Sequence, residues 1–370
     1  QTQVEAPFVA NNANFKNVII NGDMVISQRA TGTTTISGSA HNTLDRFAGL
    51  ESTDGTATLE QHSMSVADQA TTGQRYAALW KCSGTDSSIG ATQYAGLQYF
   101  AEAQHCQHFL YGTSAAKDLT LSFYVKSNTT GTYSIGIYKP DNTGYYHPTT
   151  YAISSADTWE KKVIHISPTA GSTSLITSSG GAIANDNGLG IAFYFYTALG
   201  SNYHTSSINT WSTTADFGTS DQPNLMSSTS NNWYITGVQL EIGDTASDFE
   251  HIPFDVQLQR CQRYCQKWDF TDSAGMASIG RTLSSNRVDL WFTPKLEMRA
   301  EVDAISDSLT TSTIYRGDGT RHDSTTQTAT ALVNASKAAF GVRKTYSDTI
   351  EGDNLVSTQF GGTLIATCEI

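Results

Sequence analysis

A set of tyrosines falls on the polar side of predicted strands, where the rings could meet a ligand. Tyrosine rings present a flat apolar face and a hydroxyl, which suit the apolar C–H face and hydroxyl rim of a sugar, and which suit a protein interface equally well. The rings could instead pack under a covering loop or a neighbouring subunit. The candidate carbohydrate-binding residues are Tyr124, Tyr138, Tyr194 and Tyr196 on the strands, with Tyr145 and Tyr146 in an adjoining loop that also holds His147 and Tyr151.

Other side chains that could do chemistry form no recognisable motif. Glu102 and Glu160 could pair as glycosidase carboxylates, but their separation cannot be read from a sequence. The chain has neither a GxSxG nor an HExxH motif, so we expect no enzymatic activity. His105, Cys106 and His108 lack a second ligand pair nearby, and we expect them to bind no metal.

Strands with period 2 must position the tyrosines. In 119–126, 133–138 and 191–196, apolar residues alternate with polar ones, which indicates half-buried antiparallel strands. Turn residues at 141–144 and 185–188 separate such strands. We therefore expect residues 17–252 to form a two-sheet sandwich. The expected core positions are Leu119, Leu121, Phe123, Val125, Tyr133, Ile135, Ile137, Ile191, Phe193 and Phe195.

The periodicity changes within residues 233–266. Alternation over 234–242 predicts a strand with Tyr234, Val238, Leu240 and Ile242 on one face, ended by Gly243 and Asp244. A helix is predicted next, over 253–268, with one apolar stripe. The stripe could dock on the sandwich or form a helical contact around a three-fold axis. Its residues, the candidate interdomain or oligomer contact, are Phe254, Leu258, Cys261, Cys265 and Trp268.

The remaining segments flank these units. Residues 1–16 have no period and predict an extended arm or an unstructured terminus. Residues 269–370 return to a β pattern, with strand candidates at 288–292, 331–340 and 364–368, and predict a second small β-sandwich. The expected fold class is therefore all-β: a sandwich, a short helix and a second small sandwich.

Composition excludes several classes of protein. The net charge is −12, from 22 basic and 34 acidic residues, and no basic cluster is present, so we expect no nucleic-acid partner. No apolar run reaches membrane-spanning length. Five cysteines without CxxC spacing indicate packing thiols and no zinc site. Because the first residue is Gln1, we expect a processed or trimmed product.

Five segments together resemble a family of bacteriophage virion proteins, tail-fibre-like or otherwise external, built on a carbohydrate-binding-module-like jelly roll. They are NVIINGDMVISQR (17–29), LDRF (44–47), LSFYVKS (121–127), TWEKKVIHI (158–166) and WYITGVQLEIGDTASDFEHIPFDVQLQRCQRYCQ (233–266). Two features depart from the family pattern: Cys265 replaces a second helical tyrosine, and Thr367-Cys368 replaces an acidic-alanine ending.

The resemblance implies a structural protein exposed on the virion of a tailed phage as a fibre or appendage. It implies assembly in the host cytoplasm, contacts with other virion proteins and with host polysaccharide, and a homo-oligomer, most often a trimer. A capsid decoration or cement protein is the alternative, and a polysaccharide depolymerase is a third. No cofactor is expected, except that similar modules hold a structural calcium between first and last strands. Here the segments would be 18–20 and 234–242, and the ligand candidates Asp23, Asp45 and Glu241.

Overall fold

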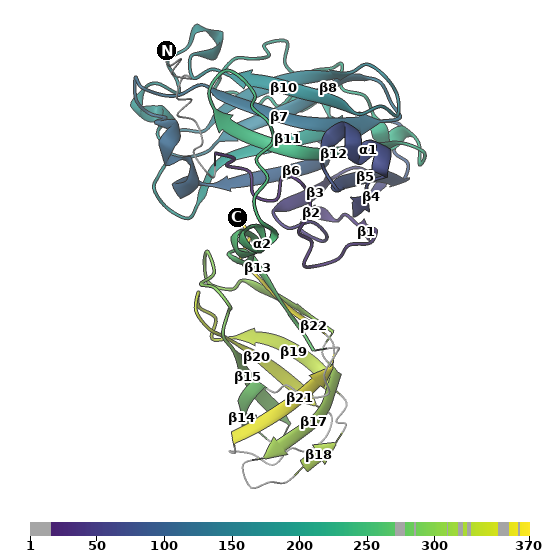
Figure 1. Ribbon diagram of the computed structural model, residues 1–370, viewed down its shortest axis with the longest axis vertical. Helices are drawn as coiled ribbons and strands as arrows, with labels where there is room; N and C mark the ends of the chain where they lie inside the picture. Colours follow the sequence, from purple (N-terminus) through teal and green to yellow (C-terminus); the bar gives the residue numbers. More distant parts are fainter. Residues whose placement is uncertain are drawn as a thin grey trace, which may run out of the picture.

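The fold is built on antiparallel β-sheets arranged as two units joined by a helix (Figure 1). The computed structural model describes residues 16–270, 278–284, 286–308, 310–316, 321–323, 327–346, 355–361 and 363–370. The predicted N-terminal arm lies outside the described residues, apart from Lys16. Among the described residues, no helix is long and apolar enough to cross a membrane.

Two six-stranded antiparallel sheets face each other in the N-terminal unit and form a jelly-roll sandwich, which confirms the predicted fold class. Sheet 1 has the order β1 (Thr34–Thr35), β4 (Thr56–Ser63), β5 (Tyr76–Gly84), β12 (Asn232–Ile242), β7 (Leu119–Ser127), β10 (Glu160–Ile166). Sheet 2 has the order β2 (Gly38–Ala40), β3 (Phe47–Glu51), β6 (Tyr94–Glu102), β11 (Leu189–Leu199), β8 (Gly131–Lys139), β9 (Tyr145–Ile153). The helix α1 (Val66–Thr72) precedes β5, and short 3₁₀ helices span 103–109, 170–172, 179–181, 201–203 and 225–227.

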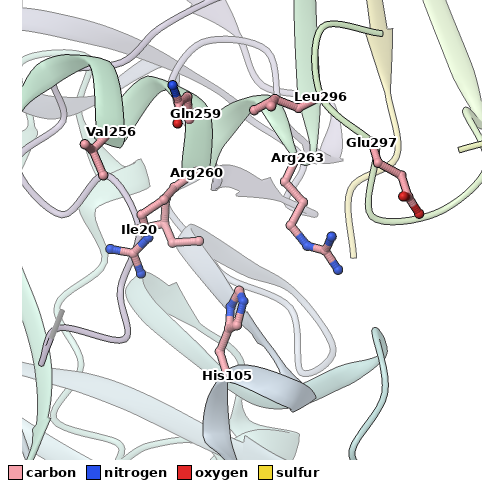
Figure 2. Close-up of a pocket in the computed structure, with 8 residues that line it drawn as sticks. All are labelled: Ile20, His105, Val256, Gln259, Arg260, Arg263, Leu296 and Glu297. Carbon is pink, nitrogen blue, oxygen red and sulfur yellow. The ribbon is translucent and has the colours of Figure 1, made fainter. Parts of the chain in front are cut away.

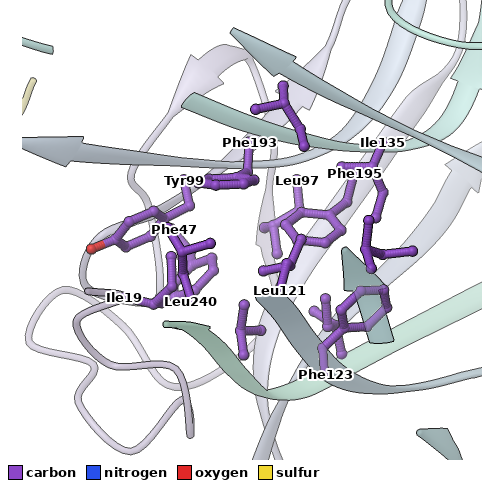
Figure 3. Packing of buried hydrophobic residues seen from close by; sticks show 14 of the residues in the cluster. Ile19, Phe47, Leu97, Tyr99, Leu121, Phe123, Ile135, Phe193, Phe195 and Leu240 are labelled. Carbon is purple, nitrogen blue, oxygen red and sulfur yellow. The ribbon is translucent and has the colours of Figure 1, made fainter. Parts of the chain in front are cut away.

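The core lies between the two sheets, and the predicted strand phases lead into it. The apolar positions of β7, β8 and β11 are all buried there, as their alternation predicted. Phe123 from sheet 1 meets Phe195 from sheet 2 edge-on, with ring centroids 5.5 Å apart. Figure 3 shows this packing with Leu97, Leu121, Ile135 and Leu240 around the rings. The tyrosines that alternate with these residues therefore point away from the core.

The predicted face of the last strand was wrong at its beginning. Val238 and Leu240 lie in the core, but Tyr234 lies on the outer face beside Trp159. The cause is a bulge at Gly237, where φ is +61° and the register with β7 shifts. A bulge adds one residue to the strand, so the side chains before it reverse their faces. Ile242, also expected on the inner face, is 40% exposed.

The first predicted strand is a hydrogen-bonded segment instead. Residues 18–20 form no regular strand, yet they lie beside β12 as expected. The backbone N–H of Val18 donates to the Leu240 carbonyl at 3.0 Å, and that of Val238 donates to the Gly22 carbonyl at 2.9 Å. Glycine is required at position 22, because a Cβ there would lie 2.0 Å from the Val238 carbonyl oxygen. This segment therefore pairs with the second half of β12, beyond the residues 232–235 that pair with β5.

The linking helix is shorter than predicted. It is α2 (Phe254–Gln262), and the chain re-enters a strand at β13 (Cys265–Asp269). The predicted stripe is therefore divided: Phe254 is 59% exposed and Cys261 is buried on the helix, whereas Cys265 and Trp268 are on the strand. A spacing of 3 and 4 residues predicts a helix, but it does not show where the helix ends. The end is set by the segment with which the following residues pair in the folded chain. In this case the partner is the chain's last strand, which pairs with β13.

The C-terminal unit packs a three-stranded sheet against a seven-stranded one, as expected for a small β-sandwich. The predicted strand at 331–340 is in fact the end of one strand, a turn and the start of the next. The small sheet has the order β13, β22 (Thr363–Thr367), β16 (Ala304–Asp307). The large sheet has the order β18 (Arg321–Asp323), β17 (Thr310–Arg316), β21 (Leu355–Gly361), β14 (Ser278–Ser284), β15 (Arg287–Phe292), β20 (Phe340–Tyr346), β19 (Gln327–Val333).

Candidate functional site

An aromatic cleft opens on the outer face of sheet 2. Its volume is about 290 Å³, and it lies over strands β3, β6 and β11. Two of the predicted tyrosines line it, together with two further tyrosines and a phenylalanine. We call this site the aromatic cleft; its lining residues are Ser39, Leu50, Tyr94, Gln98, Tyr194, Tyr196, Tyr203 and Phe217.

Strand alternation and strand pairing bring the floor of the aromatic cleft together. On β11, Phe193 and Phe195 point into the core, so Tyr194 and Tyr196 point outward. These two rings are parallel within 16°, with centroids 6.2 Å apart. The neighbouring strand β6 places Gln98 opposite Tyr194, and its amide donates to the Ser39 hydroxyl. This part of the cleft is therefore lined by two parallel, stacked tyrosine rings with an amide beside them.

The wall of the aromatic cleft is a loop that folds back over sheet 2. Phe217 in this loop contacts Tyr194, Tyr196 and Tyr203, with centroid distances of 5.5, 6.3 and 5.9 Å. Its backbone N–H donates to the Tyr203 carbonyl at 2.9 Å. Beneath it, Gly136 provides the room, since a Cβ there would approach the Phe217 ring to 2.5 Å. The loop leaves Tyr196 only 5% exposed, so this predicted ligand contact is largely a packing residue.

The aromatic cleft carries no charged side chain among its lining residues. Burial raises the pKa of the Tyr194 hydroxyl to about 12, and it also raises the pKa of the Tyr196 hydroxyl well above its usual range. Both hydroxyls therefore stay protonated at neutral pH and can donate a hydrogen bond. A neutral, hydroxyl-rich ligand with one apolar face matches such a surface, because it needs no counter-charge and can stack on the exposed ring area.

The other four predicted tyrosines lie elsewhere. Tyr124 is on the outer face of sheet 1, on the opposite side of the sandwich. Tyr138 and Tyr146 pair across β8 and β9 and stack at 4.7 Å, next to Phe217 but outside the aromatic cleft. The prediction for Tyr145 was wrong: the supposed loop is strand β9, whose alternation turns Tyr145 inward. There its ring lies under the Lys139 ammonium, 5.0 Å from the ring centroid.

Several residues of the aromatic cleft were not predicted from the sequence. Tyr94 and Gln98 occupy polar positions of β6, opposite the core residue Leu97, so an alternation search over 94–102 could have found them. Tyr203 and Phe217 lie in a segment without any period. Only the folded chain shows that this segment covers sheet 2.

The two glutamates that were candidates for a glycosidase pair have structural roles on different sheets. Glu102, on β6, is fully buried and accepts hydrogen bonds from Arg263 at 2.7 and 3.0 Å and from the Tyr264 hydroxyl. Glu160, on β10, accepts from the backbone N–H groups of Ser154 and Ser155 at 2.8 and 2.9 Å. Neither carboxylate lines the aromatic cleft.

The carboxylates expected to hold calcium are engaged separately by protein donors. Asp23 accepts from the Gln257 amide at 2.7 Å, and Asp45 accepts from the Gln28 backbone at 3.0 Å. Glu241 accepts from the Ser247 backbone N–H at 2.9 Å. Within the described part of the chain, no group of three or more His, Cys, Asp or Glu residues is placed to hold a metal. The residues present therefore do not fit the calcium site of similar modules.

A second cleft, of about 370 Å³, lies between the sandwich and α2. Figure 2 shows His105 facing this space from the sandwich, with Arg260 approaching from α2 and Arg263 from the residue that follows the helix. The Arg263 guanidinium is already bound to Glu102. We therefore interpret this cleft as space left where the two units meet. Cys106 is buried in the core, and all five cysteines are buried and free, as expected for packing thiols.

Comparison with known proteins finds only distant similarity. No family model matches the chain, and no curated protein matches it. A candidate sugar-binding protein from Bacteroides thetaiotaomicron shares 14% identity, over 61% of this chain and 100% of that one, with a TM-score of 0.34. The enzymatically active domain of bacteriophage CBA120 tailspike protein 4 shares 9% identity, over 62% and 22%, with a TM-score of 0.28. The family 11 carbohydrate-binding module of a Clostridium thermocellum cellulase shares 13%, over 58% and 96%, with a TM-score of 0.27. TM-scores this low give no basis for assigning the functions of these proteins to this chain.

Proposed function

We propose that the chain binds a neutral saccharide in the aromatic cleft, as a non-enzymatic structural protein of a tailed-phage virion. The observation that carries the binding proposal is an uncharged cleft lined by four tyrosines and a phenylalanine on the outer face of sheet 2. Aromatic faces suit sugar C–H groups, and the Gln98 amide and the tyrosine hydroxyls can exchange hydrogen bonds with sugar hydroxyls. No cofactor is needed for such binding.

The virion part of the proposal is supported by the sequence motifs at 17–29, 44–47, 121–127, 158–166 and 233–266. Their resemblance to external phage proteins supports a position on the virion surface as a fibre or appendage, after assembly in the host cytoplasm and among other virion proteins. The saccharide would then be part of the host cell surface. Immunogold labelling of intact particles tests the location, and labelling absent from every particle would contradict it.

Replacing Tyr94 or Tyr203 by alanine is expected to weaken saccharide binding by about 1–2 kcal/mol, or roughly 5- to 30-fold, because each removes an aromatic contact. The ligand is first selected on an array of bacterial surface glycans, and its affinity is then measured by calorimetry. Tyr138→Ala is the matched control: its ring stacks on Tyr146 outside the aromatic cleft, so binding should be unchanged. Equal losses in all three variants, or no glycan retained at all, would contradict the proposal.

We also expect binding without turnover. Incubation of the protein with a glycan that it retains should release no reducing ends, since Glu102 and Glu160 are tied to structural partners. The measurement is a reducing-end assay over several hours. Sustained release that disappears in Glu102→Gln or Glu160→Gln would show that the chain is a depolymerase.

We propose that copies of the chain assemble into a homo-oligomer, as a trimer. The apolar stripe is divided between a helix and a strand, but Phe254 remains 59% exposed at the start of α2, where it can contact another copy. Mass photometry of the purified protein should show a trimer, and Phe254→Ser should shift it toward the monomer. A wild-type monomer at micromolar concentration would contradict the proposed trimer.

A further inference from the structure

A polar cleft lies on the outer face of sheet 1, which is the face of the sandwich away from sheet 2. Its volume is about 270 Å³. The end of α1 and the segment 247–251 form its walls, and strands β7, β10 and β12 contribute to it. We call it the polar cleft. The residues used below are Gln74, Tyr124, Lys161, Gly237 and Asp248.

The side chain of Gln74 lines the polar cleft with an unpaired amide. Gln74 is only 3% exposed, and no acceptor in the described chain bonds its Nε2. Its backbone N–H is already satisfied by the Thr72 hydroxyl at 3.1 Å, so the side-chain amide alone is left over. Burying an amide without a partner opposes folding. A buried donor of this kind is expected to meet a partner that the chain does not supply.

The bulge at Gly237 brings a ring next to that amide. A Cβ at Gly237 would lie 3.4 Å from Cδ2 of Tyr124 and 3.6 Å from Nε2 of Gln74. The ring and the unpaired amide thus converge on the one position of β12 that has no side chain. Bulges are frequent beside binding sites, where they change the direction of neighbouring side chains. The bulge that reversed the face of Tyr234 therefore also opens this space.

The polar cleft offers donors and acceptors together. Gln74 and the exposed Lys161 can donate, and the exposed carboxylate of Asp248 can accept. A hydroxyl group both donates and accepts, so a ligand with several hydroxyls can use all three partners. An anion would meet Asp248 and a cation would meet Lys161, whereas a neutral sugar meets no opposing charge.

We propose that the polar cleft is a second saccharide site, independent of the aromatic cleft. One neutral pyranose unit lies against the Tyr124 ring and accepts a hydrogen bond from the Gln74 amide. One of its hydroxyl groups donates a hydrogen bond to the Asp248 carboxylate. The chain would then hold sugars on both outer faces of one sandwich. This inference does not rest on the aromatic cleft, which lies on the other sheet.

The test uses the full chain with Tyr94→Ala, which weakens the aromatic cleft only. Methyl glucoside, methyl galactoside, methyl mannoside and N-acetylglucosamine are titrated, and chemical shifts of the labelled protein are recorded. At least one sugar should shift resonances around Gly237. Adding Gln74→Leu should weaken that binding at least tenfold, because the amide donor is lost. It should also raise the melting temperature, because a leucine of similar size replaces a buried amide that has no partner. Tyr124→Leu, which removes the ring, should weaken binding similarly.

Two results would overturn the second site: no shift at Gly237 with any of the four sugars, or unchanged binding in both Gln74→Leu and Tyr124→Leu. Gln98→Leu is the matched control, since this buried glutamine lies in the aromatic cleft and is already bonded to Ser39. It should leave shifts at Gly237 unaltered. Loss of array binding in Tyr94→Ala with intact shifts at Gly237 supports both sites. If Tyr94→Ala and Tyr203→Ala both bind the array normally and shifts at Gly237 are still seen, the aromatic cleft is contradicted as a sugar site and the polar cleft is supported.

Discussion

Replacing Glu369 by alanine is expected to lower the free energy of unfolding by about 3–5 kcal/mol, the cost of leaving a buried charge without its partner. Glu369 is the penultimate residue, yet its carboxylate binds two arginines of the N-terminal sandwich. It lies 2.8 Å from Arg29, and it also contacts Arg46, which is only 1% exposed. Without the carboxylate, the Arg46 guanidinium loses its salt-bridge partner, and Arg29 keeps only the longer contact to Asp45 at 3.5 Å.

The neighbourhood of Glu369 shows why the loss would reach both units. The Arg46 guanidinium lies over the Tyr264 ring at 3.5 Å from its centroid, and Tyr264 follows α2. Arg299 of the C-terminal unit holds the carbonyls of Cys368 and Glu369 at 2.9 and 2.7 Å. The last residues therefore fasten the two units to each other (Figure 1).

Urea denaturation of wild type, Glu369→Ala and Glu369→Gln gives the measurement. The glutamine variant keeps a hydrogen-bonding group without charge, so its loss should be intermediate. Glu301→Ala, at an exposed position, is the control and should change stability by less than about 0.5 kcal/mol. A loss below about 1 kcal/mol for Glu369→Ala would mean that the two arginines find other partners.

Acidification from pH 7 to pH 4.5 is expected to destabilise the N-terminal sandwich through two histidines. Burial lowers the pKa of His147 to about 4. Burial likewise lowers the pKa of His41 to about 4; the neighbouring Glu369 raises it, and Arg29 and Arg46 lower it. Because the ordinary histidine pKa is about 6.5, the unfolded chain binds protons between pH 6.5 and 4 that the folded chain does not. The contribution of each histidine to the free energy of unfolding is therefore fully present above pH 6.5. It falls by roughly 2–3 kcal/mol per histidine by pH 4.5.

His147→Phe tests this contribution. His147 is fully buried on β9, and its ring lies 4.9 Å from that of Trp211. Neither ring nitrogen has a hydrogen-bond partner in the described chain. The phenylalanine variant should match wild type or exceed it at pH 7, and it should lose roughly 2–3 kcal/mol less than wild type on going to pH 4.5. Identical pH dependence in the two proteins would show that His147 is not the group responsible.

The alternation of apolar and polar residues was enough to predict the strands of the sandwich and their inner faces. Phe123, Ile135 and Phe193 are buried as their spacing requires, because a strand turns successive side chains to opposite sides. Spacing did not predict the bulge at Gly237, since one inserted residue leaves no mark in composition and yet reverses the face of Tyr234. Nor did it predict the end of α2, which is set by pairing of β13 with the last strand.

For the sites, strand alternation is enough to predict that Tyr194 and Tyr196 point away from the core, because Phe193 and Phe195 must point into it. Which outward tyrosines meet was decided by the tertiary structure. Strand order separates Tyr124 from the others onto the opposite sheet, and the return of the loop carrying Phe217 buries Tyr196 and walls the aromatic cleft. Local periodicity describes only the two faces of each strand. Strand order and loop packing depend on contacts between residues far apart in the chain, which periodicity does not encode.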